Sequence, residues 1–264
     1  MIPGLPDGFH IASRSYGSAS DHKIDLEQLT DVERAYVSLF RNEPRRRASA
    51  AARAACRSIL QQIGRVEWQV IPDEHGAPHF VTIPEGESVT TASVSLTHSE
   101  GLALALVSET RDILAVGLDL ERPQPSILRT LDDFFTREEI AQIRALKPKD
   151  GVLLATRIWA SREAVLKVLG TGFGATAQSV SIDVIDEGRG RAHVSAIDGL
   201  PQGLSLELRL STIEGLIACV AWIENQDLKA LRDARPEPRR SFPWTNFKTR
   251  MFHDNSKQTI GGLV

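Results

Sequence analysis

The chain has 264 residues, a formal net charge of −3, 42% hydrophobic residues and 25% charged residues. This composition is typical of a soluble globular protein with one large domain or two smaller ones. No run of about 18 or more apolar residues occurs, which excludes an ordinary membrane-spanning helix. The N-terminus lacks a charged segment followed by an apolar one, so we expect no secretory signal. Cys56 and Cys219 lie in apolar segments, which favours buried, reduced thiols in a cytoplasmic protein.

The chain is predicted to begin with a loop followed by two helical stretches. Residues 1–25 are rich in Gly, Pro and Ser and lack periodicity, which predicts mostly loop. Residues 24–39 carry apolar side chains at helical spacing, with Thr30 as a possible cap or break. Residues 41–64 predict a second helix, for which Gly64 is a suitable C-terminal stop.

The second predicted helix is rich in arginine. Arg46, Arg53 and Arg57 fall on one stripe of it, and Arg47 lies beside that stripe. Such a stripe is most often a solvated basic face. Because guanidinium groups present paired donors to phosphate oxygens, it could instead be a clamp for a phosphate.

Five strands are predicted before the middle of the chain. Residues 68–71 and 80–83 form two short apolar segments on either side of a turn. Residues 91–98 alternate between apolar and polar side chains, and residues 101–108 follow a short turn, which predicts a hairpin. Residues 113–120 form the next strand after another polar turn. The short connections between the last three strands predict an antiparallel meander.

The second half repeats the order of helices followed by strands. Residues 127–135 are predicted to be helical, and Thr136 with Glu139 forms a capping box for a helix that reaches about residue 145. Residues 150–169 predict a long amphipathic helix. Four further strands are expected at residues 180–184, 192–196, 204–211 and 216–222.

Residues 228–264 differ from the rest of the chain. They contain eight Lys or Arg and three Asp or Glu, a net charge of +5, which leaves −8 for the residues before them. A basic tail on an acidic body is one indication of nucleic-acid binding. We do not favour that class, because the charges are scattered and no recognisable reader motif occurs. Several prolines and a Gly pair predict a mostly disordered tail.

The first motif whose side chains could bind a ligand or take part in a reaction is a predicted strand with two carboxylates. Residues 116–121 (Val-Gly-Leu-Asp-Leu-Glu) alternate around Asp119 and Glu121, so a strand here would present both carboxylates on one face. Mg²⁺ takes oxygen ligands and keeps several waters, and such a pair would suit it. No His/Cys spacing typical of a zinc site occurs.

The second motif is a stripe on the long helix predicted at residues 150–169. Trp159, Glu163 and Lys167 are spaced i, i+4 and i+8 and share one face. Glu163 would add a third oxygen ligand to the two of the strand. Lys167 would neutralise charge on a phosphate, or it would only form an ion pair with Glu163, and the spacing leaves both open.

His98 ends a predicted strand and could contact a phosphate or transfer a proton, although a lone histidine is more often structural or exposed. The chain contains no Gly-x-Ser-x-Gly nucleophile elbow, no Walker loop and no Gly-x-Gly-x-x-Gly motif after a strand. These absences argue against the serine hydrolases and the common nucleotide-binding folds.

In this order, the motifs resemble those of the Sfp-type 4′-phosphopantetheinyl transferases, the holo-acyl-carrier-protein synthase superfamily. That family shows a Val/Ile-Gly-Ile/Val-Asp-Ile/Leu-Glu strand, which residues 116–121 match, and a Trp-x-x-Lys-Glu-x-x-x-Lys helix, to which residues 159–167 are similar. Residues 94–101 resemble the family's Ser-x-Ser-His-Ser-x-Gly strand, with Thr97 in place of the second Ser. The arginine-rich helix is similar as well, and the resemblance covers roughly residues 30–225.

The resemblance implies an α+β fold of two similar halves related by pseudo-twofold symmetry, with the active site in the cleft between them. On this basis we expect an N-terminal half at residues 1–111, a C-terminal half with the metal site at residues 112–227, and the tail at residues 228–264. The expected protein is a monomer that binds neither nucleic acid nor membrane.

The resemblance also implies a reaction, the transfer of 4′-phosphopantetheine from coenzyme A to a serine of an apo acyl or peptidyl carrier protein, with release of adenosine 3′,5′-bisphosphate. Coenzyme A is the substrate and Mg²⁺ the cofactor. By resemblance, the metal ligands are Asp119, Glu121 and Glu163, the catalytic residues are Glu163, Lys167 and His98, and coenzyme A is bound by Arg47, Arg53, Thr97, His98, Arg162 and Lys167.

Two positions depart from the family pattern. The family's Lys before the helix Glu is Arg162 here, which keeps the charge and changes the geometry. The family's Gly-Lys-Pro turn, whose Lys meets coenzyme A, is Gly-Ala-Pro at residues 76–78. The loss of that contact weakens coenzyme A binding unless His75, His79 or an arginine replaces it. Ala77 thus favours an alternative, a catalytically weak relative that binds coenzyme A or a carrier without turnover.

Overall fold

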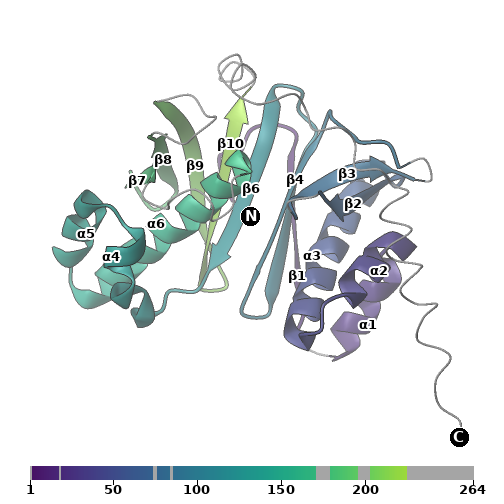
Figure 1. Ribbon diagram of the computed structural model, residues 1–264, viewed down its shortest axis with the longest axis horizontal. Helices are drawn as coiled ribbons and strands as arrows, with labels where there is room; N and C mark the ends of the chain where they lie inside the picture. Colours follow the sequence, from purple (N-terminus) through teal and green to yellow (C-terminus); the bar gives the residue numbers. More distant parts are fainter. Residues whose placement is uncertain are drawn as a thin grey trace, which may run out of the picture.

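The computed structural model describes residues 2–17, 19–73, 76–83, 86–170, 179–195 and 203–224. Within these ranges the chain has an α+β fold, in which helices gather at two sides of a central group of strands (Figure 1). The helices are α1 (Ala19–Gln28), α2 (Asp31–Ser38), α3 (Glu43–Gln62), α4 (Leu131–Phe134), α5 (Arg137–Arg144) and α6 (Pro148–Leu169), with a 3-10 helix, η1, at Pro125–Arg129. The strands are β1 (Phe9–Ser15), β2 (Trp68–Pro72), β3 (Pro78–Thr82), β4 (Ser93–Ser99), β5 (Leu102–Ser108), β6 (Ile113–Glu121), β7 (Val180–Val184), β8 (Arg189–Val194), β9 (Leu204–Ile213) and β10 (Leu216–Glu224).

The first sheet has the strand order β1-β5-β4, and β2 and β3 form a separate hairpin. Helix α3 packs against this sheet through its alanine-rich face, which allows close approach. Its residues Cys56, Ile59 and Leu60 share an apolar core with Val70 and Phe80 of the hairpin. Helix α3 therefore covers one face of the sheet. The arginine-rich start of α3 lies near the C-terminal end of β1.

The second sheet has the strand order β6-β10-β9-β8-β7, with every neighbouring pair antiparallel. Helix α6 packs against β6 and β10. Another apolar cluster joins the two sheets, since Leu104 and Leu106 of β5 lie in it with Leu118 and Leu120 of β6. Both sheets thus meet at β6, the strand that carries the carboxylate motif.

The prediction of mostly loop for residues 1–25 is wrong. Residues Phe9–Ser15 form strand β1, which pairs with β5 in antiparallel register from Phe9 opposite Ser108 to Ser15 opposite Leu102. Most positions of β1 are half-buried, so it lacks the clear alternation that marks a strand with one apolar face. Pairing with β5 supplies the order that local sequence does not signal.

The predicted meander is also wrong at its third strand. Strands β4 and β5 form the expected hairpin, but β6 leaves that sheet and pairs with β10. The partner strand is about a hundred residues away in the chain, from Glu121 opposite Ile217 to Ile113 opposite Glu224. Short connections favour neighbours in sequence, but they do not specify a pairing with a distant strand.

Two capping boxes anchor the short helices. Thr30 and Glu33 form one at the start of α2, and Thr136 and Glu139 form the predicted one at the start of α5. The Glu33 carboxylate also accepts a hydrogen bond from the backbone N–H of Val70 in β2, at 3.0 Å. Each box therefore satisfies the helix start, and the glutamate of each box also ties its helix to a strand.

The expected tail at residues 228–264 lies outside the described residues. Within the described ranges, no helix is long and apolar enough to cross a membrane. The pseudo-twofold relation and the boundary at residues 111/112 stay predictions.

Candidate active site

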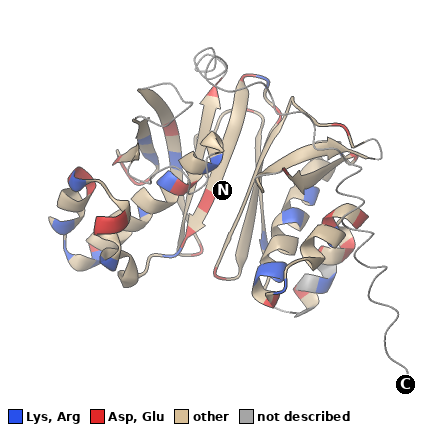
Figure 2. Ribbon diagram, in the orientation of Figure 1, with Lys and Arg blue, Asp and Glu red and all other residues tan. Residues whose placement is uncertain are grey.

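Helix α6 lies unusually close to β6 because the strand has a glycine at the contact. A Cβ atom on Gly117 would lie 1.9 Å from the backbone oxygen of Ala164 and 3.0 Å from Val168 Cγ2. Only glycine permits this approach of helix and strand backbones. Glu163 and Lys167, on either side of Ala164, are thereby brought alongside the carboxylate end of β6, where both interact with Asp119. Figure 2 shows charged positions of α6 next to the acidic positions of β6.

Asp119 is the centre of the resulting polar cluster. Lys167 Nζ donates to Asp119 Oδ1 and to the backbone oxygen of Leu118, both at 2.7 Å. Thr97 Oγ1, from β4 in the other sheet, donates to the same Asp119 oxygen at 3.3 Å. Asp119 Oδ2 is buried and has no hydrogen-bond partner among the described residues. Side chains from both sheets and from α6 therefore converge on one carboxylate.

Glu121 and Glu163 are carboxylates that resist ionisation at this centre. Burial, reinforced by the nearby charge of Asp119, raises the pKa of each to about 7. Lys167 counteracts part of this effect at both residues. Glu163 Oε1 is buried and unpaired among the described residues. Clustered carboxylates with raised pKa values are typical of sites that bind a cation or transfer a proton.

Trp159 holds one of these carboxylates in place. Its Nε1–H donates to Glu121 Oε1 at 3.2 Å, and its ring meets that of Phe134 edge-on with centroids 5.2 Å apart. The sequence places Trp159 on the same helical face as Glu163, and the structure adds that it orients Glu121. The sequence did not reveal that Trp159 binds Glu121. Its spacing of four residues from Glu163 was the signal that could have indicated a place in the site.

The chemistry of the donor set fits Mg²⁺, the ion that the family resemblance implies. Asp119, Glu121 and Glu163 offer hard carboxylate oxygens, which Mg²⁺ prefers, and two of those oxygens lack a partner. Across the described ranges, however, no group of three or more His, Cys, Asp or Glu side chains is arranged as a metal site. Here Lys167 neutralises Asp119, so an ion would share that carboxylate with the ammonium group.

His98 lies beside the carboxylate cluster on the exposed end of β4. Its pKa is lowered, because surrounding atoms partly remove its water and because Lys167 and Arg45 place positive charge nearby. The ring is therefore neutral at neutral pH and able to donate one hydrogen bond and accept another. It meets the ring of Tyr16 edge-on, with centroids 6.2 Å apart.

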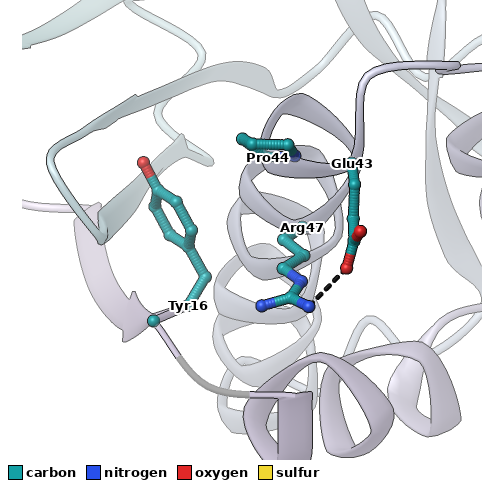
Figure 3. Close-up of a pocket in the computed structure, with 5 residues that line it drawn as sticks. Tyr16, Glu43, Pro44 and Arg47 are labelled. Atoms are coloured by element: carbon teal, nitrogen blue, oxygen red, sulfur yellow. Dashed lines mark hydrogen bonds and ion pairs between the residues drawn. The ribbon is translucent and has the colours of Figure 1, made fainter.

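Tyr16 connects His98 to a pocket of about 380 Å³. The pocket lies between the end of β1 and the first turn of α3, and it is lined by Tyr16, Gly17, Glu43, Pro44 and Arg47 (Figure 3). Arg47 points toward Glu43 and forms an ion pair with it. Tyr16 had no sequence signal, because it falls in the segment predicted to be loop.

Arg53 lies in the core, and its predicted role in binding coenzyme A stays a prediction. Its side chain is buried, donates to Ser49 Oγ at 2.7 Å, and lies over the Tyr36 ring at 4.4 Å from the centroid. Arg57 on the same stripe is also buried and donates to the backbone oxygen of Trp68. The stripe therefore divides: its inner part packs in the core, and only its start, with Arg47, reaches the pocket.

Arg162 also lies in the core, and its predicted contact with coenzyme A stays a prediction. It is 0% exposed, and its guanidinium donates to both carboxylate oxygens of Glu139, at 2.6 and 2.7 Å. It further donates to the backbone oxygen of Val180, and it lies over the ring of Phe135. Glu139 in turn accepts from the N–H of Ile182. This ion pair fastens α6 to α5 and β7.

The turn at residues 76–78 connects β2 to β3 without a basic side chain. Asp73 closes it, since its carboxylate accepts from the N–H of Ala77 at 2.9 Å. His79 is partly buried with a lowered pKa, caused chiefly by desolvation, and His75 lies outside the described residues.

The family comparison matches the segment that holds the cluster. Residues 115–221 match the family model described as the 4′-phosphopantetheinyl transferase superfamily. This segment includes the carboxylates of β6 together with Glu163 and Lys167 of α6. No curated protein matches the chain.

Proposed function

We propose that the protein transfers the 4′-phosphopantetheine group of coenzyme A to a serine of an apo acyl or peptidyl carrier protein. One observation carries this proposal: a carboxylate and lysine cluster at Asp119 is linked through Thr97, His98 and Tyr16 to a pocket that holds Arg47. Coenzyme A carries a diphosphate in the middle of the molecule and a 3′-phosphate on its ribose. These two groups could occupy the two ends of this path.

Each end of the path suits one of these phosphates. Lys167, Thr97 and the neutral His98 are placed to donate to the diphosphate, and Arg47 to the 3′-phosphate by exchanging its bond to Glu43. Guanidinium groups are well suited to phosphate because they donate in pairs. Because Ala77 replaces the lysine of the family pattern, Arg47 of the pocket and Lys167 supply the positive charge for the phosphates of coenzyme A.

The reaction requires an attacking oxygen, a base and neutralisation of the leaving group. The serine oxygen attacks the phosphorus that bears pantetheine, the bond from that phosphorus to the bridging diphosphate oxygen breaks, and adenosine 3′,5′-bisphosphate leaves. Glu163, with its pKa raised to about 7, accepts the serine proton. Lys167 neutralises charge on the departing phosphate. A magnesium ion held by Asp119, Glu121 and Glu163 would supply further positive charge to the diphosphate.

The test is incubation with coenzyme A, Mg²⁺ and a panel of apo carrier proteins, followed by intact-mass measurement. We expect at least one carrier to gain the mass of one phosphopantetheine group. Folded protein that modifies no carrier in the panel contradicts the proposal. The protein is proposed to act in the cytoplasm as a monomer, and size-exclusion chromatography with light scattering checks its oligomeric state.

The role of Glu163 gives the first prediction. Glu163→Gln removes the base while keeping the shape, and should lower the transfer rate about 100-fold or more with nearly unchanged unfolding midpoint. Glu187→Gln is the matched control, because that carboxylate is exposed and pairs only with Arg157 among the described residues. A fully active Glu163→Gln protein refutes the assigned role.

The second candidate function is binding of coenzyme A or a carrier without turnover, which Ala77 favours. Calorimetry separates the two: this candidate requires binding of coenzyme A with no modified carrier and no released adenosine 3′,5′-bisphosphate. Substitution of Ala77→Lys should then tighten coenzyme A binding, if the missing lysine is what limits affinity.

A further inference from the structure

Strands β4 and β6 lie side by side without forming a backbone ladder. They are edge strands of different sheets, yet two backbone amides of β6 donate to serine hydroxyls of β4. Val116 N–H donates to Ser93 Oγ at 3.1 Å, and Leu118 N–H donates to Ser95 Oγ at 2.9 Å. We call Ser93 and Ser95 with these two amides the hydroxyl seam.

The seam follows from strand geometry. Along an edge strand, alternate residues direct their backbone groups toward the neighbouring strand and away from it. In β6 the amides of Val116 and Leu118 point away from β10 and would be unsatisfied without a partner. On β4, residues two apart project side chains from one face, so Ser93 and Ser95 meet these amides in turn.

The seam leads directly to the candidate active site. Two residues beyond Ser95, Thr97 Oγ1 donates to Asp119, one residue beyond Leu118. The backbone oxygen of Leu118 accepts from Lys167 Nζ. Ser95 is 3% exposed and Thr97 6% exposed. The contact between β4 and β6 is therefore shielded from solvent at both residues.

A side chain between two strands sets a different spacing from a ladder. Directly hydrogen-bonded strands lie about 4.8 Å apart, whereas an interposed serine holds the backbones further from each other. Beyond the seam, the side chains of Thr97 and Lys167 meet at Asp119.

We propose that Ser95 is a positioning residue, which fixes Thr97 and His98 on β4 relative to Asp119 on β6. This inference rests on the proposed function. If coenzyme A contacts β4 through its phosphates while Mg²⁺ contacts β6, the hydroxyl seam couples the two binding events by holding their ligands at one separation. Loss of the seam lets the strands part, and each ligand then binds more independently of the other.

The first measurement needs neither ligand. In Ser95→Ala, hydrogen exchange at the amides of Val116 and Leu118 should speed up at least tenfold relative to Ser108→Ala. Ser108 is the matched control: it is a buried serine of the same sheet whose hydroxyl accepts from the Thr110 N–H and not from β6. Equal protection of both amides in the two variants overturns the seam.

The second measurement is the coupling between ligands, obtained by calorimetry of coenzyme A binding with and without Mg²⁺. Coupling factors between two ligands are commonly about 5- to 150-fold. We expect Ser95→Ala to cut the wild-type factor at least threefold and Ser108→Ala to leave it unchanged. If Ser95→Ala does not fold, Ser93→Ala, at the half-buried far end of the seam, carries the same test.

The outcomes separate this inference from the proposed function. A wild-type protein that couples the two ligands, with full coupling retained in Ser95→Ala, overturns the positioning role and leaves the proposed function intact. A wild-type protein that does not bind coenzyme A overturns the proposed function. Wild-type binding of coenzyme A without any coupling to Mg²⁺ overturns the positioning role, because there is then nothing for the seam to couple.

Discussion

Arg162 and Glu163 are adjacent on α6 and have opposite surroundings. Successive residues of a helix point about 100° apart, so one side chain enters the core while the other faces the carboxylate cluster. Arg162 is buried, and its Nε and Nη2 groups donate to Val180 and Glu139, whereas its Nη1 has no hydrogen-bond partner among the described residues. The charge of Arg162 holds α6 to α5, whereas Glu163 belongs to the proposed catalytic cluster.

Substitution of Arg162 should therefore destabilise the fold. Arg162→Leu leaves the Glu139 carboxylate buried without its counter-ion, and loss of one partner of a buried ion pair costs about 3–5 kcal/mol. Urea unfolding should show this fall in the free energy of unfolding. Arg144→Leu is the control, because its pair with Asp132 is exposed and such pairs contribute about 0–1 kcal/mol. An Arg162→Leu protein of wild-type stability but weak coenzyme A binding would instead support the predicted ligand-binding role.

At the scale of elements, the site depends on the contact between β6 and α6. Gly117 allows the two backbones to touch at Ala164, and this contact determines how far Glu163 stands from Asp119. The glycine of the strand motif is thus explained by packing, while the carboxylates that follow it are explained by chemistry. A glycine inside a strand is the sequence signal for such an approach.

Gly117→Ala should disrupt both stability and activity. The new Cβ would meet backbone atoms, which cannot move aside as a flexible side chain can, so we expect a cost of at least about 2–3 kcal/mol from overpacking. Thermal unfolding and the transfer rate should fall together. Gly188→Ala is the control, because its Cβ would meet no atom closer than 3.7 Å. A Gly117→Ala protein with wild-type melting temperature would show that α6 does not lie this close.

At the scale of the whole molecule, two sheets share one apolar cluster, and stability also depends on groups far from the site. Asp25 of α1 is only 2% exposed, and its Oδ2 has no hydrogen-bond partner among the described residues. Burial raises its pKa from 3.8 to about 6, against the opposing influence of Arg14, with a smaller upward contribution from Asp21. The folded state therefore holds a proton that the unfolded chain releases between these values.

This raised pKa predicts a stability that falls with increasing pH. The contribution of Asp25 is fully present below about pH 4 and is lost as the pH rises through about 6. We expect a loss of about 1–2 kcal/mol, which is reduced from the full effect of the pKa shift because solvent and Arg14 screen the charge. Denaturant unfolding of wild type and Asp25→Asn from about pH 4 to about pH 7 isolates this component. The same pH dependence in both proteins contradicts it.

Local sequence by itself determined most of the elements and the acidic end of the site. A period of two places Asp119 and Glu121 on one strand face, and a period of 3.6 places Trp159, Glu163 and Lys167 on one helix face. These relations lie within single elements, so they need no knowledge of the fold. The capping box at Thr136 is local for the same reason, and the structure confirms it.

Only the tertiary structure decided which elements meet and which side of a helix is covered. It brought β6 to β10, placed β1 beside β5, and joined Thr97 to Asp119 across two sheets. It also buried Arg53 and Arg162, whose spacing along the chain is the same whether their face is solvated or packed. The physical reason is that periodicity specifies directions within one element, whereas burial and distant pairing depend on surfaces contributed by residues far away in sequence.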